Sequence, residues 1–176
     1  MKRFFMTAIC VVAIVSLQAQ MTLDVKNISV GQYSYPVILP SKENLIKLVN
    51  CDVESFKATM KKYNYHPKDK YVGTDYCYDN WHLMLWMHGN NGKGANTYTL
   101  GFTNDGTVCS CDIPSSAVWP EGYIADWHRS MMPYNIRSDG KDETYLYETT
   151  DAYYGFFLQF SKDSTQIRIT IKKFPK

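Results

Sequence analysis

Gln166-Ile-Arg-Ile-Thr-Ile-Lys-Lys173, near the end of the chain, is the stretch of sequence that decides the fold. Apolar and polar residues alternate along it, and such alternation is typical of a β-strand with one buried face and one solvated face. The buried set is predicted to be Ile167, Ile169 and Ile171, and the solvated set Arg168, Thr170 and Lys172.

A hairpin is predicted earlier in the chain, around Asn104-Asp105-Gly106. This turn separates predicted strands at residues 96–103 and 107–113, and Gly106 can adopt a positive φ without steric cost. The second of these strands also alternates, and one parity is predicted to face the core: Cys109, Cys111 and Ile113.

Further strands are predicted at residues 71–78, 81–88, 144–149 and 153–160. Helices are predicted from Ser41 to about Asn50 and after Asp52, because both side chains can cap a helix before apolar residues at helical spacing. Residues 115–132 are predicted to form an irregular or helical connector. The resulting fold class is α+β, with antiparallel β-sheet meanders and two or three helices.

The chain contains a weak internal repeat. Residues 56–65 align with residues 127–136, with identities at Met60/Met131, Tyr63/Tyr134 and Asn64/Asn135, and residues 71–86 then match residues 145–160 in apolar pattern. This favours a tandem duplicated helix-plus-sheet unit, with possible sub-units at 41–113 and 115–176. The alternative is two unrelated amphipathic segments in one α+β fold.

Tandem units of this length and order resemble the exported β-lactamase-inhibitor-like proteins. That resemblance implies a protein that binds other proteins with a sheet face. It concerns architecture alone, so it assigns no functional residue to this sequence.

The N-terminal residues have the layout of a secretory signal peptide. Lys2 and Arg3 precede an apolar run at residues 4–17, and Ala19 offers a cleavage point before Gln20. We therefore expect residues 1–19 to be removed and residues 20–176 to form a single domain, periplasmic or secreted. The alternative is a buried N-terminal helix. The run is shorter than the roughly 20 residues of a membrane span, and the mature chain is predicted to contain no span.

Processing would also change the charge balance. The chain has 19 Lys and Arg residues against 17 Asp and Glu residues, and loss of Lys2 and Arg3 makes the two sets equal. A neutral mature chain provides no electrostatic argument for a nucleic-acid partner.

Four cysteines lie outside the predicted leader: Cys51, Cys77, Cys109 and Cys111. An even number in an oxidising compartment favours disulfides. Two residues of one strand lie about 6.6–6.8 Å apart, at the outer limit for a bridge, so Cys109 is not expected to pair with Cys111. Cys51 is expected to pair with one of the other three. The alternative is four buried free thiols.

No pattern in the chain predicts a metal site, a cofactor or a catalytic residue. The four histidines lack metal-ligand spacing, and the loop at residues 89–94 does not match the phosphate-loop pattern. An enzyme is therefore the less favoured class, although a hydrolase or thiol enzyme of unrecognised type remains the alternative.

Aromatic residues are the one compositional excess, at 15% of the chain with 14 tyrosines and 4 tryptophans. Such residues serve cores and also binding faces. Trp86 in a predicted strand, with Trp119 and Tyr123 in a predicted loop, are the candidate binding residues. They favour an exported, non-catalytic protein that recognises a protein or glycan partner. A structural, envelope-associated subunit is a further alternative. The sequence identifies neither the partner nor the oligomeric state.

Overall fold

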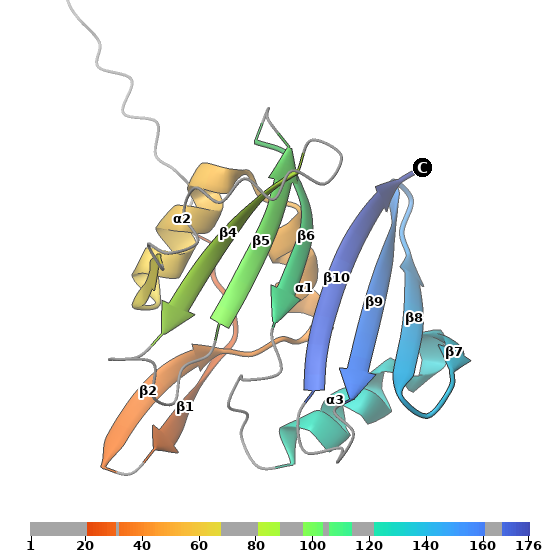
Figure 1. The fold of residues 1–176 in the computed structure, drawn as a ribbon, viewed down its shortest axis with the longest axis horizontal. Coiled ribbons are helices and arrows are strands. Elements are labelled where there is room, and N and C mark those ends of the chain that lie inside the picture. Colours follow the sequence, from red (N-terminus) through yellow and green to blue (C-terminus); the bar gives the residue numbers. More distant parts are fainter. Residues whose placement is uncertain are drawn as a thin grey trace, which may run out of the picture.

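The computed structural model describes residues 21–30, 32–67, 81–88, 97–103, 106–113, 122–160 and 167–176. The predicted leader, the strand predicted at 71–78, Cys77 and Trp119 lie outside these ranges. Within them the α+β prediction is confirmed, because three helices pack on antiparallel sheet (Figure 1).

Among the described residues, eight strands form the main sheet, and every neighbouring pair of them is antiparallel. From one edge to the other the order is β3 (Tyr65–Pro67), β4 (Trp81–His88), β5 (Thr97–Thr103), β6 (Val108–Ile113), β10 (Ile167–Pro175), β9 (Ala152–Phe160), β8 (Asp142–Glu148) and β7 (Asn135–Ser138). A separate two-stranded sheet consists of β1 (Val25–Val30) and β2 (Tyr33–Ile38).

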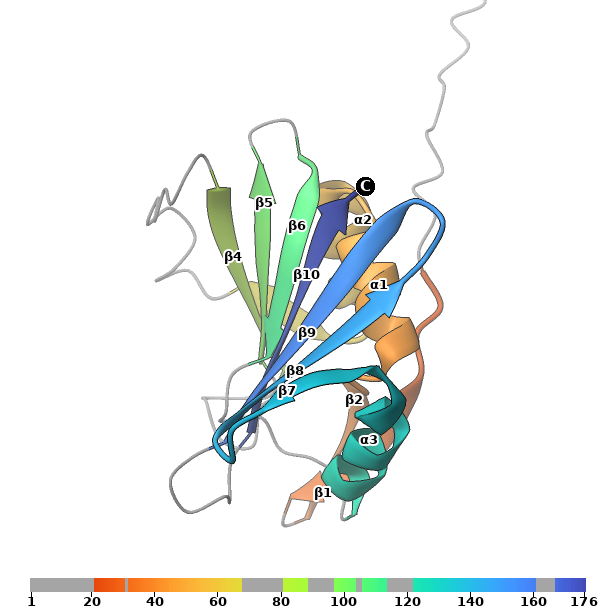
Figure 2. The same ribbon diagram turned by 90° about the vertical axis from the view of Figure 1, so that its right-hand side faces the viewer.

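The first two helices begin where their capping residues predict. α1 (Lys42–Val49) follows Ser41, whose side chain accepts the backbone N–H of Asn44. α2 (Val53–Lys62) follows Asp52, which accepts the backbone N–H of Ser55. α3 (Tyr123–Met131), followed by the short η1 (Met132–Tyr134), occupies part of the predicted connector. All three α-helices lie on the same face of the main sheet (Figure 2).

The chain repeats one arrangement twice. α2 is followed by the meander β3–β4–β5–β6, and α3 is followed by the meander β7–β8–β9–β10, with β6 beside β10. The helical part of the sequence repeat agrees with this, because Met60 and Met131 are both buried in α2 and α3. The strand part of the repeat does not agree with the structure. The apolar pattern aligns residues 81–86 with residues of β9, whereas by the order of strands in the two meanders the counterpart of β4 is β8.

The core lies between the sheet and the helices. Ile169 and Ile171 are fully buried in β10 while Arg168 and Lys172 are exposed, so the predicted alternation is confirmed for these residues. Cys111 is buried as predicted. The pairing of β6 with β5 shifts by one residue at Cys109, whose side chain lies outside the described part of the structure.

Within the described residues, no helix is long and apolar enough to cross a membrane.

Candidate binding face on the open side of the sheet

The second meander presents a sheet face that no described helix covers (Figure 2). Paired residues of an antiparallel sheet point to the same side. The register therefore shows which residues of β8, β9 and β10 point to each side of the sheet. Tyr145, Phe156 and Ile171 are paired and point toward the helices, whereas Thr144, Phe157 and Thr170 are paired and point away. We call the second side of β8, β9 and β10 the open face. It contains Asp142, Thr144, Leu146, Glu148, Tyr153, Gly155, Phe157, Gln159, Arg168, Thr170, Lys172 and Phe174.

An apolar cluster lies at the centre of the open face. Phe174 is 45% exposed and Leu146 is 37% exposed. Gly155 separates the two, and a Cβ atom there would lie 3.0 Å from the Phe157 ring and 3.2 Å from the Phe174 ring. Both rings therefore pack over the bare backbone of Gly155. The absence of a side chain at this position lets two aromatic residues of neighbouring strands come together on the surface.

One cation of the open face has no carboxylate partner. Lys172 Nζ lies 5.8 Å from the centroid of the Phe157 ring, and within the described ranges no Asp or Glu pairs with it. The neighbouring cations are paired. Arg168 lies 3.6 Å from Asp112, and Lys176 lies 2.6 Å from Glu148. The open face thus has an apolar centre, one free ammonium group and a polar rim.

A hollow of about 240 Å³ lies at one end of the open face, where β7, β8 and β9 run side by side. Phe157 belongs both to this hollow and to the apolar cluster. The hollow is lined by Arg137, Asp142, Glu143, Thr144, Phe157, Leu158 and Gln159.

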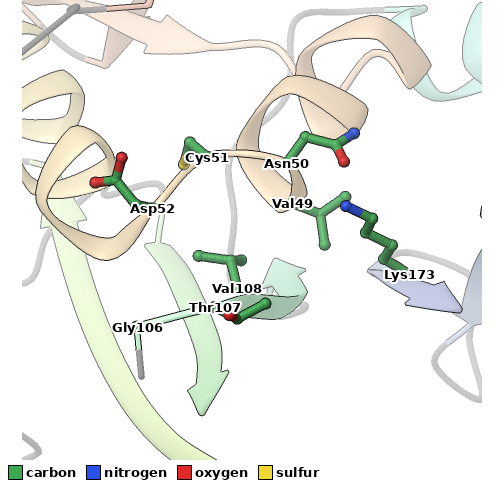
Figure 3. A pocket seen from close by; sticks show the side chains of 8 residues that line it. All are labelled: Val49, Asn50, Cys51, Asp52, Gly106, Thr107, Val108 and Lys173. Atoms are coloured by element: carbon green, nitrogen blue, oxygen red, sulfur yellow. The ribbon is translucent and has the colours of Figure 1, made fainter. Parts of the chain in front are cut away.

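A larger and shallower hollow, of about 360 Å³, lies where α1 and α2 meet the start of β6 (Figure 3). Two of its polar side chains, Asn50 and Asp52, already have structural roles. Asn50 donates to Ile46 O at 2.9 Å and to Tyr154 Oη at 2.7 Å, and Asp52 caps α2. Burial, together with the nearby Asp52 carboxylate, raises the pKa of the Cys51 thiol to about 12. A nucleophilic cysteine needs a lowered pKa, so this hollow lacks the electrostatics of a thiol enzyme.

The predicted disulfide receives no support from the structure. Cys51 and Cys111 are free thiols. Cys51 Sγ instead donates to Leu48 O at 3.0 Å. Bridges that involve Cys77 or the side chain of Cys109 concern atoms outside the described part of the chain.

A polar cluster links α3 to the second meander on the other side of the sheet. His128 Nε2 lies 2.9 Å from Glu143 Oε2, the Tyr145 hydroxyl donates to Glu143, and the Ser138 hydroxyl does so at 3.3 Å. Glu143 is 12% exposed. Desolvation alone would raise the pKa of Glu143, but the hydrogen bonds from Tyr145 and His128 outweigh it and the pKa is lowered. Because three donors share one carboxylate, the cluster acts as a cross-link between elements.

The described part of the chain contains no group of three or more His, Cys, Asp or Glu residues that could hold a metal ion.

Of the three predicted binding residues, Tyr123 alone has a described side chain. Tyr123 is the first residue of α3, half-buried against the core on the helical side, and burial raises its pKa. The backbone of Trp86 pairs with Tyr98 in the sheet, but its side chain lies outside the described atoms, as does all of Trp119. The roles predicted for the two tryptophans therefore stay predictions.

Sequence reasoning missed the residues of the open face. The available signal was that β9 carries aromatic residues on both parities, Tyr153 and Phe157 on one and Tyr154 and Phe156 on the other. Only one parity can face the helices, so the other was bound to place aromatic rings on the second face of the sheet.

Comparisons with protein-family models, curated proteins and solved structures found no match. The resemblance to the β-lactamase-inhibitor-like proteins therefore depends on the order of helices and strands alone.

Proposed function

We propose that this chain is an exported, non-catalytic binding module that recognises a protein or glycan partner through the open face. The observation that carries the proposal is the apolar cluster of Leu146, Phe157 and Phe174 around Gly155. An apolar cluster on a surface, rimmed by polar groups, is typical of an interaction site. Aromatic side chains suit this role because they offer large contact areas with few rotatable bonds.

Lys172, with which no Asp or Glu of the described residues pairs, adds specificity to this face. It is paired in the sheet with Gly155, and its Nζ atom lies 5.8 Å from the centroid of the Phe157 ring. A partner that covers the cluster must either solvate this ammonium group or supply an acceptor for it, because a buried unpaired charge is costly. Lys172 is thus the position at which a charge reversal should interfere most with binding.

Two alternatives have weaker support. An enzyme of the thiol class would need an activated cysteine, whereas the pKa of both described cysteines is raised by burial. A structural subunit that associates through sheet edges would need long edge strands. Among the described residues, the edge strands of the main sheet are short: β3 comprises three residues up to Pro67, and β7 comprises four and has a register shift at Ile136.

Site-specific cross-linking would test the proposal. A photoreactive phenylalanine analogue replaces Phe174, and in a matched control it replaces Ile136, which is 62% exposed on β7 outside the open face. We expect position 174 to give one discrete adduct in the producing cells, and we expect Lys172→Glu to abolish it. The absence of an adduct at position 174, or the same adduct from both positions, would contradict the proposal.

Export is proposed on the basis of the leader-like N-terminus. Intact-mass and N-terminal analysis of the protein from envelope and medium fractions should find Gln20 as the first residue. Recovery of a chain that retains Lys2 would reject this part of the proposal.

A further inference from the structure

The hollow at the end of the open face combines an aromatic ring with free polar side chains. It lies across three adjacent strands, with Arg137 on β7, Asp142 and Thr144 on β8, and Phe157 and Gln159 on β9. The backbone pairing of these strands fixes the relative positions of the side chains: Thr144 is paired with both Arg137 and Phe157, and Asp142 with Gln159.

The aromatic wall of the hollow is Phe157. Its ring packs over Gly155 and is flanked by Lys172 Nζ at 5.8 Å. These contacts lie on one side of the ring, and the ring also lines the hollow. An aromatic surface of this kind packs against flat apolar groups, including the C–H face of a ring that is otherwise polar.

Three polar residues of the hollow have unused hydrogen-bonding capacity, whereas Glu143 and Arg137, which also line it, are already paired. Across the described residues, the side chains of Asp142, Thr144 and Gln159 make no hydrogen bond to any other protein group. The Gln159 amide and the Thr144 hydroxyl both donate and accept, and the Asp142 carboxylate accepts. A ligand that carries several hydroxyl groups matches this mixture, because each hydroxyl also donates and accepts.

Charge further restricts the ligand. Arg137 is paired with Asp139 at 3.1 Å, so its charge is compensated, whereas the carboxylate of Asp142 has no cation beside it among the described residues. An anionic ligand would meet the Asp142 carboxylate and be disfavoured. The volume, about 240 Å³, falls below the roughly 300–1,000 Å³ typical of drug-sized ligands, which favours a single small ring.

We infer that this hollow is a subsite for one neutral sugar ring, with its C–H face on Phe157 and its hydroxyls bonded to Asp142, Thr144 and Gln159. The inference rests on the proposed function and makes it more specific, because it names a glycan as the partner. Further sugar units would extend from the hollow along the open face toward Phe174.

The test is an NMR titration of the purified, ¹⁵N-labelled protein with four neutral trisaccharides: maltotriose, cellotriose, mannotriose and chitotriose. We expect at least one of them to shift the amide signals of Thr144, Leu158 and Gln159 saturably. Gln159→Leu and Asp142→Ala should each weaken that affinity roughly five- to tenfold, the effect of one lost hydrogen bond. Ile136→Ala, on β7 but outside the hollow, should leave it unchanged.

The outcomes separate this inference from the proposed function. If none of the four sugars shifts these signals, or if the shifts survive both hollow variants, the sugar subsite is rejected. If a protein is nevertheless cross-linked at position 174, the open face remains a binding face and its partner is a protein. If both the titration and the cross-linking fail, the proposed function is rejected as well.

Discussion

The hydroxyl of Tyr98 donates a hydrogen bond of 2.7 Å to the backbone carbonyl of Ile38, although the two residues are 60 positions apart in the chain. The hydroxyl of Tyr65 accepts the backbone N–H of the same residue at 3.1 Å. The two tyrosine rings meet edge to face, with centroids 5.6 Å apart. Two fully buried side chains of the main sheet thus satisfy both backbone groups of Ile38, and they attach the end of β2 to that sheet.

Tyr98→Phe should destabilise the protein, because it removes a donor and leaves a buried carbonyl without a partner. We expect a loss of about 1–3 kcal/mol in the free energy of unfolding. Tyr153→Phe is the matched control, since Tyr153 is half-buried on the open face and its hydroxyl makes no hydrogen bond within the described structure. Urea denaturation of both variants provides the measurement. Equal stability of the two variants would contradict the role given to Tyr98.

The antiparallel α+β class could be predicted from the sequence because alternation and capping are local signals. Ile169 and Ile171 alternate with exposed residues as expected, and Ser41 and Asp52 begin helices. The contact between β6 and β10 is not local. It joins the last strands of the two meanders through pairs such as Cys111 with Ile171, and no pattern within either strand specifies its neighbour.

The candidate site was harder to predict, for a physical reason. Whether Phe157 is a core residue or a surface residue depends on which side of the sheet the helices cover, and the sequence of β9 is aromatic on both sides. Tyr123 was expected in a surface loop and lies instead in a helix, partly buried against the core. Its neighbours Pro120 and Gly122 indicate a loop, but α3 begins at Tyr123 and turns its ring toward the core.

Lys42 connects α1 to η1 and β8 through two aromatic rings, Tyr134 and Tyr147. Its Nζ atom lies 4.4 Å from the centroid of the Tyr147 ring and 4.8 Å from that of Tyr134, and it donates to the Tyr134 hydroxyl at 3.3 Å. Burial alone would lower the pKa of Lys42, but the hydrogen bond to Tyr134 and the charge of Glu43 outweigh it, so the amine stays protonated.

Lys42→Met keeps the apolar stem and removes the charge. We expect it to lower the free energy of unfolding by about 1–2 kcal/mol, because the cation–π contacts are partly desolvated. Lys57→Met is the control, since Lys57 only pairs with Glu54 on the surface of α2 and such pairs contribute less than about 1 kcal/mol. Urea denaturation at pH 7 compares the two. A smaller effect at Lys42 than at Lys57 would argue against this connection.

Glu143 should make stability depend on acid pH. Its folded-state pKa is lowered, so the folded protein binds a proton less readily than the unfolded chain does. The stabilisation is therefore complete above the unfolded value of about 4.3 and is lost as the pH falls through the folded value. Glu143→Gln should lower the free energy of unfolding by about 1–3 kcal/mol at pH 7, because hydrogen bonds to a charged group are replaced by neutral ones.

The same variant should also lose less stability than the unmodified protein as the pH falls below about 5, because it lacks the carboxylate that takes up a proton there. Glu54→Gln, at an exposed position on α2, serves as the control and should not change the loss of stability at acid pH. Denaturation curves measured at several pH values give the comparison. If the unfolding free energy of Glu143→Gln falls with acid pH as steeply as that of the unmodified protein, another group is responsible.

Cys51 should react slowly with alkylating agents while the protein is folded. With a pKa of about 12, the Cys51 thiol contains roughly three orders of magnitude less thiolate at pH 8 than an ordinary cysteine. We expect iodoacetamide to leave Cys51 and the fully buried Cys111 unmodified in the native protein and to modify both in urea. Peptide mass mapping measures this, and without reduction it also reveals any disulfide. Rapid native alkylation of Cys51 would contradict the assigned burial.

Gly155→Ala should rearrange the open face with little change in stability. The new Cβ atom would lie 3.0 Å from the Phe157 ring and 3.2 Å from the Phe174 ring, and both contacts involve the ends of side chains that can move. Displacing the rings opposes the gain of about 0.5–1 kcal/mol expected when glycine is removed from a strand, so the two effects largely cancel.

The rearrangement would be visible in the aromatic ¹³C signals of Phe157 and Phe174, and the cross-linked adduct at position 174 should weaken with it. Gly140→Ala is the control in which stability should fall while the two rings stay in place. Gly140 has φ +83° and open space around it, so alanine there strains the backbone, lowering stability by about 1 kcal/mol without moving either ring. If Gly155→Ala leaves the ring signals in place, the two rings do not pack over Gly155, and the apolar cluster that carries the proposed function is not formed as described.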